Sequence, residues 1–153
     1  MKTKTEKKQT DKKQAEKKVR TTSGSKRLTG DVARAVKAAL DKKAQDVVVL
    51  DLRQTPAFTD FFVLCSGTNP RQVKAIADAV EETLRAGKVR PAHVEGYDRA
   101  EWVLMDFFSF IVHVFTPQTR EFYSLERLWG DANRIEVSDA PPEAAKTRAD
   151  ADE

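Results

Sequence analysis

The chain has 153 residues, of which 33% are charged, and its formal net charge is +3. This length suits one folded domain and excludes two. All apolar runs are far shorter than the roughly 18 to 20 residues that a membrane span needs, so we expect a soluble protein. A single cysteine cannot form an internal disulfide, and together with two histidines it cannot supply a thiolate-rich zinc site. The composition therefore indicates one soluble domain in a reducing compartment.

The positive charge is concentrated at one end of the chain. Residues 1–28 carry eleven Lys and Arg against three acids, residues 29–130 carry thirteen against fourteen, and residues 131–153 carry three against seven. The first segment has almost no apolar side chain, and the last mixes Ala, Pro and acids without periodicity. Neither can bury enough surface to offset the entropy of ordering. We therefore expect a disordered basic tail at 1–28, a folded domain at 29–130 and a disordered acidic tail at 131–153.

The folded segment begins with a predicted helix followed by two strands. Apolar residues recur at helical spacing over 32–43, and Asp31 precedes them as a plausible N-cap. Residues 47–52 and 61–66 are nearly continuous apolar runs, which is typical of strands that are covered on both faces. An eight-residue loop joins the two strands.

The second predicted helix has a strong start signal. Asn69 can cap it, Pro70 stands at a first helical position where a missing N–H is harmless, and Gln72 stands where a capping box places Gln. Apolar residues from Val73 onward then recur at i, i+3, i+4, i+7 and i+11, which predicts one buried stripe. Gly87 ends the helix.

The last third of the domain predicts three strands and one more helix. A short strand lies around 93–95, and the runs 102–107 and 110–116 are close enough to form a tight hairpin. Pro117 then opens a helix that ends at Gly130. The apolar residues of this helix that should face the core are Phe122, Leu125 and Leu128. The order α-β-β-α-β-β-β-α predicts a single α/β domain with a mixed sheet of about five strands and three helices.

The sequence gives little support for catalysis. Cys65 lies in an apolar strand, where a free cysteine is usually a small buried hydrophobe. The string SGTNP lacks the glycines of a nucleophile elbow and the Gly-Lys-Ser/Thr ending of a phosphate-binding loop. His93 and His113 have no second ligand at close spacing, and no strand carries paired carboxylates. We expect no catalytic residue, metal or cofactor, and we expect His113 to be a hydrogen-bonded structural histidine.

Large aromatic residues gather in the last third of the domain. Strand alternation puts Trp102, Leu104 and Asp106 on one face of the 102–107 strand. Trp and Tyr beside charged residues are typical anchors of protein–protein interfaces, although core burial of Trp102 is an open alternative. Nucleic-acid binding would depend on the lysine tail alone, since no aromatic residue is interleaved there to stack on bases. A solvated tail that aids solubility is the other open interpretation.

Four blocks of the sequence together resemble one known family. LDLRQTPAFTDFFVLCSGTNPRQVKAIAD, VEGYDRAEWVLMDF, FIVHVF and REFYSLERLW follow in an order and spacing that closely resemble the ribosomal silencing factors, the RsfS or Iojap-like family. The resemblance covers roughly residues 30–130 and leaves out both tails. Phe108 and Ser109 depart from it, because many members carry Gly and an acid in this turn.

The resemblance implies a non-catalytic domain with a fold similar to nucleotidyltransferases. It implies a cytoplasmic repressor of translation that binds the large ribosomal subunit through ribosomal protein L fourteen and blocks joining of the small subunit when nutrients are scarce. The family's contact region maps best onto EGYDRAEWVLMD, with Trp102 as the apolar anchor. The other expected contact residues are Glu95, Asp98, Leu104, Asp106 and Tyr123, although for Tyr123 we favour burial under the sheet over a contact role. A homodimer and a weak rRNA contact through the tail are compatible with this picture, and a nucleotidyltransferase-like enzyme acting on a nucleotide or RNA end is the alternative function.

Overall fold

The structure is a computed structural model that describes residues 20–21, 28 and 30–138. Its strands are β1 (Arg20–Thr21), β2 (Gln45–Asp51), β3 (Phe61–Ser66), β4 (His93–Glu95), β5 (Trp102–Asp106), β6 (Phe110–Phe115) and β7 (Asn133–Ser138). Its helices are α2 (Gly30–Asp41), α3 (Pro70–Ala86), α4 (Pro117–Tyr123) and α5 (Leu125–Leu128). No helix within these described ranges is long and apolar enough to cross a membrane.

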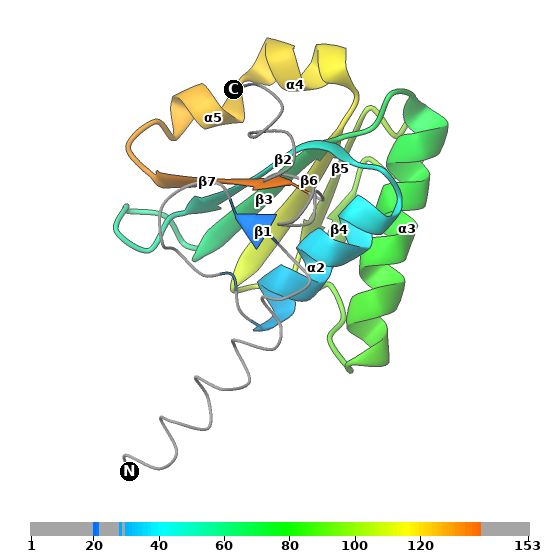
Figure 1. Cartoon of the computed structure of the whole chain (residues 1–153), viewed down its shortest axis with the longest axis horizontal. Helices are drawn as coiled ribbons and strands as arrows, with labels where there is room; N and C mark the ends of the chain where they lie inside the picture. Colours follow the sequence, from blue (N-terminus) through cyan, green and yellow to red (C-terminus); the bar gives the residue numbers. More distant parts are fainter. Residues whose placement is uncertain (1–19, 22–27, 29, 139–153) are drawn as a thin grey trace, which may run out of the picture.

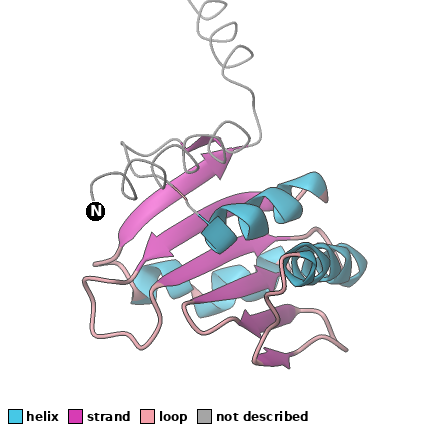
Figure 2. Ribbon diagram, turned by 90° about the horizontal axis from the view of Figure 1, so that it is seen from below, coloured by secondary structure: helices cyan, strands magenta, loops and turns pink. Residues whose placement is uncertain are grey.

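The strands form one mixed sheet with helices on both faces. The strand order is β1-β7-β2-β3-β6-β5-β4, with β3 and β6 parallel and the other described pairs antiparallel. α2 and α3 cover one face, while α4 and α5 lie over the other (Figure 1). Figure 2 shows the twisted sheet between these two helical layers. The predicted α/β domain with a mixed sheet is confirmed, but the described residues form seven strands and four helices instead of about five and three. The two additional strands are β1, which lies in the expected basic tail and pairs with β7, and β7 itself, which lies in the expected acidic tail.

The larger core lies between the sheet and the helices α2 and α3. The predicted stripe of α3 is buried there, and its residues are Val73, Ile76, Ala77, Val80 and Leu84. They pack with the apolar side of α2 and with alternate residues of β2, β3, β5, β6 and β7. A smaller cluster lies on the opposite face, beneath α4 and α5. Side chains on that opposite face therefore have thinner cover.

The start of α3 follows the predicted signal with one difference. The Asn69 side chain accepts a hydrogen bond from the Gln72 N–H at 2.9 Å, which confirms the cap. The Gln72 side chain accepts from the Thr68 N–H at 2.7 Å, one residue before the cap. Its amide also donates to the carbonyls of Lys42 and Lys43, at 3.2 and 3.1 Å. Gln72 thus joins α3 to the loop after α2.

The chain after residue 130 differs from the expected solvated tail. β7 pairs with β2 over residues 133–137, and Ile135 and Val137 are buried in the larger core. The domain boundary at residue 130 was therefore too early. The sequence does alternate here, because the apolar residues 135 and 137 are separated by charged residues at 134 and 136 on the other face. These charges give the segment the look of a solvated tail. Residues 139–153 of the expected acidic tail and most of the basic tail lie outside the described residues.

The predicted last helix is also different. Ser124 has a φ of 47°, in the left-handed region, and it separates α4 from α5. This break changes the helical phase, so Phe122 and Leu128 are 79% and 71% exposed instead of facing the core. Leu125 alone of the three predicted core residues packs against the smaller cluster.

Candidate protein-binding surface

The sheet face beneath α4 carries most of the expected contact residues. The β4–β5 register pairs Glu95 with Leu104 and His93 with Asp106. Directly paired residues point to the same face of a sheet, so both pairs share the face of Trp102. The three β5 residues of this face are half-buried, whereas the two residues between them are buried. The predicted alternation of β5 is confirmed.

Trp102 is neither a core residue nor a free surface residue. Its indole Nε1–H donates to Nδ1 of His113 at 3.0 Å. Its ring lies 5.1 Å from the ring of Phe115 and 4.8 Å from that of Tyr123, measured between centroids. The hydrogen bond and the two ring contacts fix the orientation of the indole, while the side chain stays half exposed.

His113 is the polar centre of the smaller cluster. It is buried, and burial lowers the pKa of its imidazole to about 3. The ring is therefore neutral near pH 7, and because Nδ1 accepts from Trp102, the proton is on Nε2. Nε2 has no hydrogen-bond partner among the described residues, although the ring packs edge-on against Phe62 at 4.7 Å. The prediction of a hydrogen-bonded structural histidine is confirmed.

The remaining expected contact residues lie around this face. Asp98 is exposed in the loop between β4 and β5. Tyr123, at the end of α4, is 51% exposed, so it is not buried under the sheet. The Asp106 carboxylate accepts a hydrogen bond from the Phe108 N–H at 2.8 Å and thereby shapes the hairpin turn. The structure brings Glu95, Leu104 and Asp106 together with Trp102 and places Tyr123 against the indole.

The loop between β4 and β5 is held by two specific interactions. Gly96 has a φ of +78°, and a Cβ there would lie 2.0 Å from the Trp102 carbonyl oxygen, so only glycine fits. The Tyr97 hydroxyl donates to Asp78 of α3 at 2.8 Å, and this hydrogen bond raises the pKa of the phenol. Lys74 lies over the Tyr97 ring. The loop that carries Asp98 is thus fixed against α3.

An open hollow of about 480 Å³ lies beside Trp102. It lies between the β4–β5 loop, the start of β5 and α4. Its lining residues are Gly96, Arg99, Glu101, Trp102, Gln118, Thr119, Phe122 and Tyr123. Three of them are aromatic, and two carry opposite charges.

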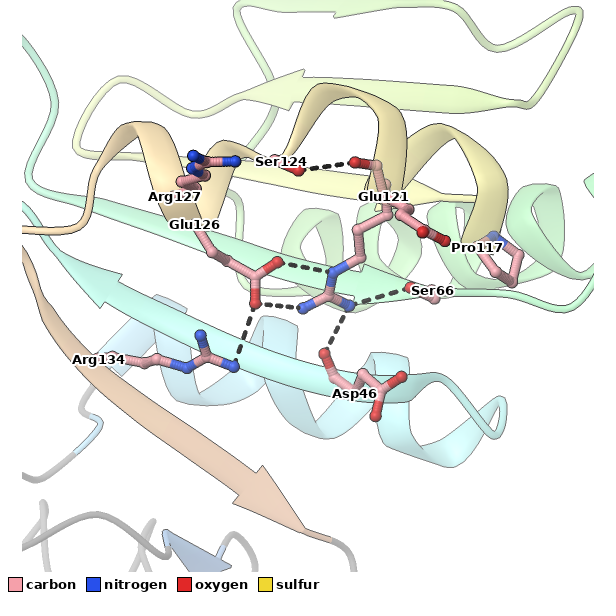
Figure 3. A pocket seen from close by; sticks show the side chains of 9 residues that line it. Asp46, Ser66, Pro117, Glu121, Ser124, Glu126, Arg127 and Arg134 are labelled. Carbon is pink, nitrogen blue, oxygen red and sulfur yellow. Dashed lines mark hydrogen bonds and ion pairs between the residues drawn. The ribbon is translucent and has the colours of Figure 1, made fainter.

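A polar network fixes α4 and α5 over the sheet, around a second hollow of about 550 Å³ (Figure 3). One guanidinium nitrogen of Arg120 donates to the Asp46 carbonyl at 2.7 Å and to the Ser66 hydroxyl at 3.0 Å. Two others pair with the Glu126 carboxylate, each at 3.1 Å. Arg134 of β7 reaches the same carboxylate at 3.2 Å. Sequence reasoning missed this network, because its members lie on distant segments with no local spacing to reveal them.

The chemical inventory of the described part contains no metal-binding group. Among these residues, no three His, Cys, Asp or Glu side chains are placed to hold a metal ion. Cys65 is fully buried, and burial raises the pKa of its thiol to about 12. The thiol is therefore protonated at neutral pH and is closed off from reagents.

Comparison with known proteins decides the family. The sequence model of RsfS, "Ribosomal silencing factor during starvation", matches residues 25–153. The chain belongs to the RsfS family. The match extends past residue 130, in agreement with the place of β7 in the sheet.

Named relatives of this RsfS family member come from bacteria and from an animal. The ribosomal silencing factor RsfS of Halalkalibacterium halodurans is 41% identical over 103 residues, which cover 67% of this chain and 88% of the relative. That of Bacillus subtilis is 39% identical and covers 64% of this chain and 83% of the relative. A mouse protein named "Mitochondrial assembly of ribosomal large subunit protein 1" is 32% identical, over 65% of this chain and 45% of its own length.

Solved structures of similar proteins share the fold. A crystal structure of a Chromobacterium violaceum protein is 34% identical, covers 65% of this chain and 83% of its own, and has a TM-score of 0.64. A second, from Bacillus halodurans, is 40% identical, covers 62% and 89%, and has a TM-score of 0.57.

The β5–β6 turn, where this RsfS family member departs from the family resemblance, holds Phe108 in an unusual backbone conformation. Phe108 has a φ of 73° and is exposed. This left-handed conformation favours glycine, which agrees with the glycine that the family resemblance leads us to expect in this turn. The Asp106 carboxylate and the Thr59 hydroxyl, which donates to the Phe108 carbonyl at 3.0 Å, hold the phenylalanine backbone in place.

Proposed function

We propose that this RsfS family member binds the large ribosomal subunit and represses translation by keeping the small subunit from joining. The observation that carries the proposal is the family match over residues 25–153. The mouse relative, whose name refers to assembly of the ribosomal large subunit, supports the same target. By the same resemblance, the contact on the large subunit is ribosomal protein L fourteen, the setting is nutrient limitation, and the place is the cytoplasm.

The mechanism is steric occlusion. A folded domain of about a hundred residues that occupies the joining face excludes the small subunit by competition, without a chemical step or a cofactor. The outcome then depends on affinity and concentration, since the repressor and the small subunit compete for one state of the large subunit.

The contact surface in this proposal is the β4–β5 face with the end of α4. Trp102 is the apolar anchor, with Leu104 and Tyr123 beside it. Glu95 and Asp98 provide exposed carboxylates at the rim. A half-exposed, oriented tryptophan within a polar rim matches the anatomy of protein interfaces.

Replacement of Trp102 tests this assignment. We expect Trp102→Ala to cost about 2 kcal/mol or more of binding free energy, roughly a thirtyfold loss of affinity for purified large subunits. Phe58→Ala is the matched control, because Phe58 is an exposed aromatic residue on a loop outside this face. A folded Trp102→Ala protein that binds as tightly as wild type refutes the assignment.

The competing function is a nucleotidyltransferase-like enzyme, and the likeness of the fold to that class is likewise inferred from the resemblance. That function requires magnesium-dependent turnover of a nucleotide or RNA end, lost on replacing Asp60 or Asp106 by Asn. Our proposal expects no turnover in any of these proteins. Turnover that depends on both magnesium and these aspartates contradicts it.

A further inference from the structure

The hollow beside Trp102 has aromatic walls that are open to solvent. The Tyr123 ring lies 4.8 Å from the indole, and the Phe122 ring meets Tyr123 edge-on at 4.9 Å. Thr119 and Gln118 add polar groups from α4. A partner's side chain that enters this hollow would therefore contact the faces and edges of aromatic rings.

The chain segment 93–106, part of which borders the hollow, is acidic, although the chain as a whole is positive. Four carboxylates stand against one arginine over residues 93–106, whereas the full chain has a net charge of +3. The carboxylates are Glu95, Asp98, Glu101 and Asp106. The arginine is Arg99, which lies 3.8 Å from Glu101 with side chains that are 84% and 56% exposed. An exposed pair at this distance contributes little stability, so it is easily exchanged for a better one.

We propose that this hollow binds a lysine or arginine side chain presented by a basic protein partner. The aliphatic stem packs on Trp102 and Tyr123, the cation lies within about 6 Å of a ring, and the Glu101 carboxylate is its counter-ion. In the free protein Arg99 holds the place of this cation, and the partner's side chain displaces it. This inference rests on the proposed function and adds the chemistry of the partner at that site.

The arrangement favours a cation over the two other classes of guest. An anionic side chain or an RNA backbone could use Arg99, the one cation of the lining, only by separating it from Glu101, and it would do so beside the acidic β4–β5 segment. An uncharged apolar side chain would fit the rings, but its binding would not depend on Arg99 or Glu101. The three classes therefore predict different signs for charge substitutions at these two positions.

The first experiment measures dissociation constants between full-length variants and purified large ribosomal subunits. We expect Arg99→Ala to tighten binding about threefold at low salt, Glu101→Gln to weaken it about threefold and Glu101→Lys to weaken it about tenfold. The effects shrink as ionic strength rises, because the charges are exposed. Glu101 supports the fold through its carbonyl, which accepts from the Thr116 N–H, so side-chain variants remain folded. Arg85→Ala and Glu82→Gln on α3 are the matched controls, with no change expected.

If Arg99→Ala weakens binding and the Glu101 substitutions tighten it, the bound side chain is anionic. If neither position affects the affinity, the bound side chain is uncharged. Each of these results overturns the cation site and leaves the proposed function standing. If the wild-type chain binds no large subunit, the proposed function fails, and a second measurement decides on the hollow.

The second measurement is independent of the ribosome. A blocked Gly-Arg-Gly peptide is titrated into the labelled full-length protein, and the indole N–H signals are followed by NMR. We expect the Trp102 signal to shift, the Trp129 signal to stay in place as an internal control, and the Trp102 shift to be lost in Glu101→Lys. An unmoved Trp102 signal in the wild-type protein overturns the site.

Discussion

Trp102 and His113 form a single unit. The indole N–H needs an acceptor when it is partly buried, and the neutral imidazole provides one at 3.0 Å. Within the described part of the chain, this is the one hydrogen bond of the imidazole, because its Nε2 lies among apolar rings without a partner. Burying the unpaired Nε2–H of His113 costs free energy. In return, the hydrogen bond holds the Trp102 side chain in one orientation, so less conformational entropy is lost when a partner binds.

The low pKa of His113 makes stability depend on pH. The unfolded chain binds a proton at this histidine below its ordinary pKa of 6.5, whereas the native protein does not do so until about pH 3. The free energy of unfolding should therefore fall as the pH is lowered from 6.5 to 4, by at most about 1.4 kcal/mol per pH unit from this group. Above pH 6.5 this group adds no pH dependence.

Denaturant unfolding from pH 7 to pH 4 measures the effect. His113→Gln should lose stability less steeply with falling pH than wild type, and Gln54→Ala, an exposed change that involves no titratable group, should keep the wild-type slope. Equal slopes in wild type and His113→Gln would show that His113 titrates normally and that its burial is wrong.

β7 is the element that extends the domain beyond the predicted boundary. Ile135 of β7 is buried in the larger core. We expect Ile135→Ala to lower the free energy of unfolding by about 2 to 4 kcal/mol, because it leaves a cavity. Asp131→Asn, an exposed change just before the strand, should alter it by less than about 0.5 kcal/mol. If Ile135→Ala changes the free energy of unfolding as little as the control does, this segment is a solvated tail and not a strand of the core.

The α4–α5 segment depends on polar anchors more than on packing. Neither helix has a fully buried residue, and Arg120 joins them to β2 and β3. We expect Arg120→Ala to raise the hydrogen-exchange rates of amides in 117–129 by tenfold or more, with the α3 amides little changed. Arg127→Ala, at an exposed position of the same segment, is the control. If the exchange rates of the α3 amides rise as much as those of 117–129, the α4–α5 segment does not open locally.

The sequence predicts well those features of helices and strands that depend on residues close together in the chain. Asn69, Pro70 and Gln72 lie within four positions, and they correctly predict the start of α3. β7 is short, and its partner β2 lies more than 80 positions earlier, so its alternation stands out only once the sheet is known. The bond of Arg120 to Ser66 spans 54 positions, and nothing in the local sequence points to it.

The candidate site shows the same limit. Alternation in β5 correctly placed Trp102, Leu104 and Asp106 on one face, because period two is a local property. The phase of the last helix was wrong at Phe122, because a left-handed Ser124 is not visible in the pattern. As a result, the aromatic wall of the hollow beside Trp102 came from the structure and not from the sequence.

The described part of the molecule combines an α/β body with an acidic, aromatic β4–β5 face. The net charge of +3 comes from the first 28 residues, since the body carries nearly equal numbers of acids and bases. A basic partner is therefore attracted to the β4–β5 face and not to the chain at large. This distribution fits the proposed binding of the chain to a site on another particle.

The most direct test of the central claim is co-sedimentation of the full chain with isolated large subunits, followed by addition of small subunits. We predict that the chain pellets with large subunits and that the yield of joined ribosomes falls as its concentration rises. A chain that stays in the supernatant and leaves the yield of joined ribosomes unchanged contradicts the account.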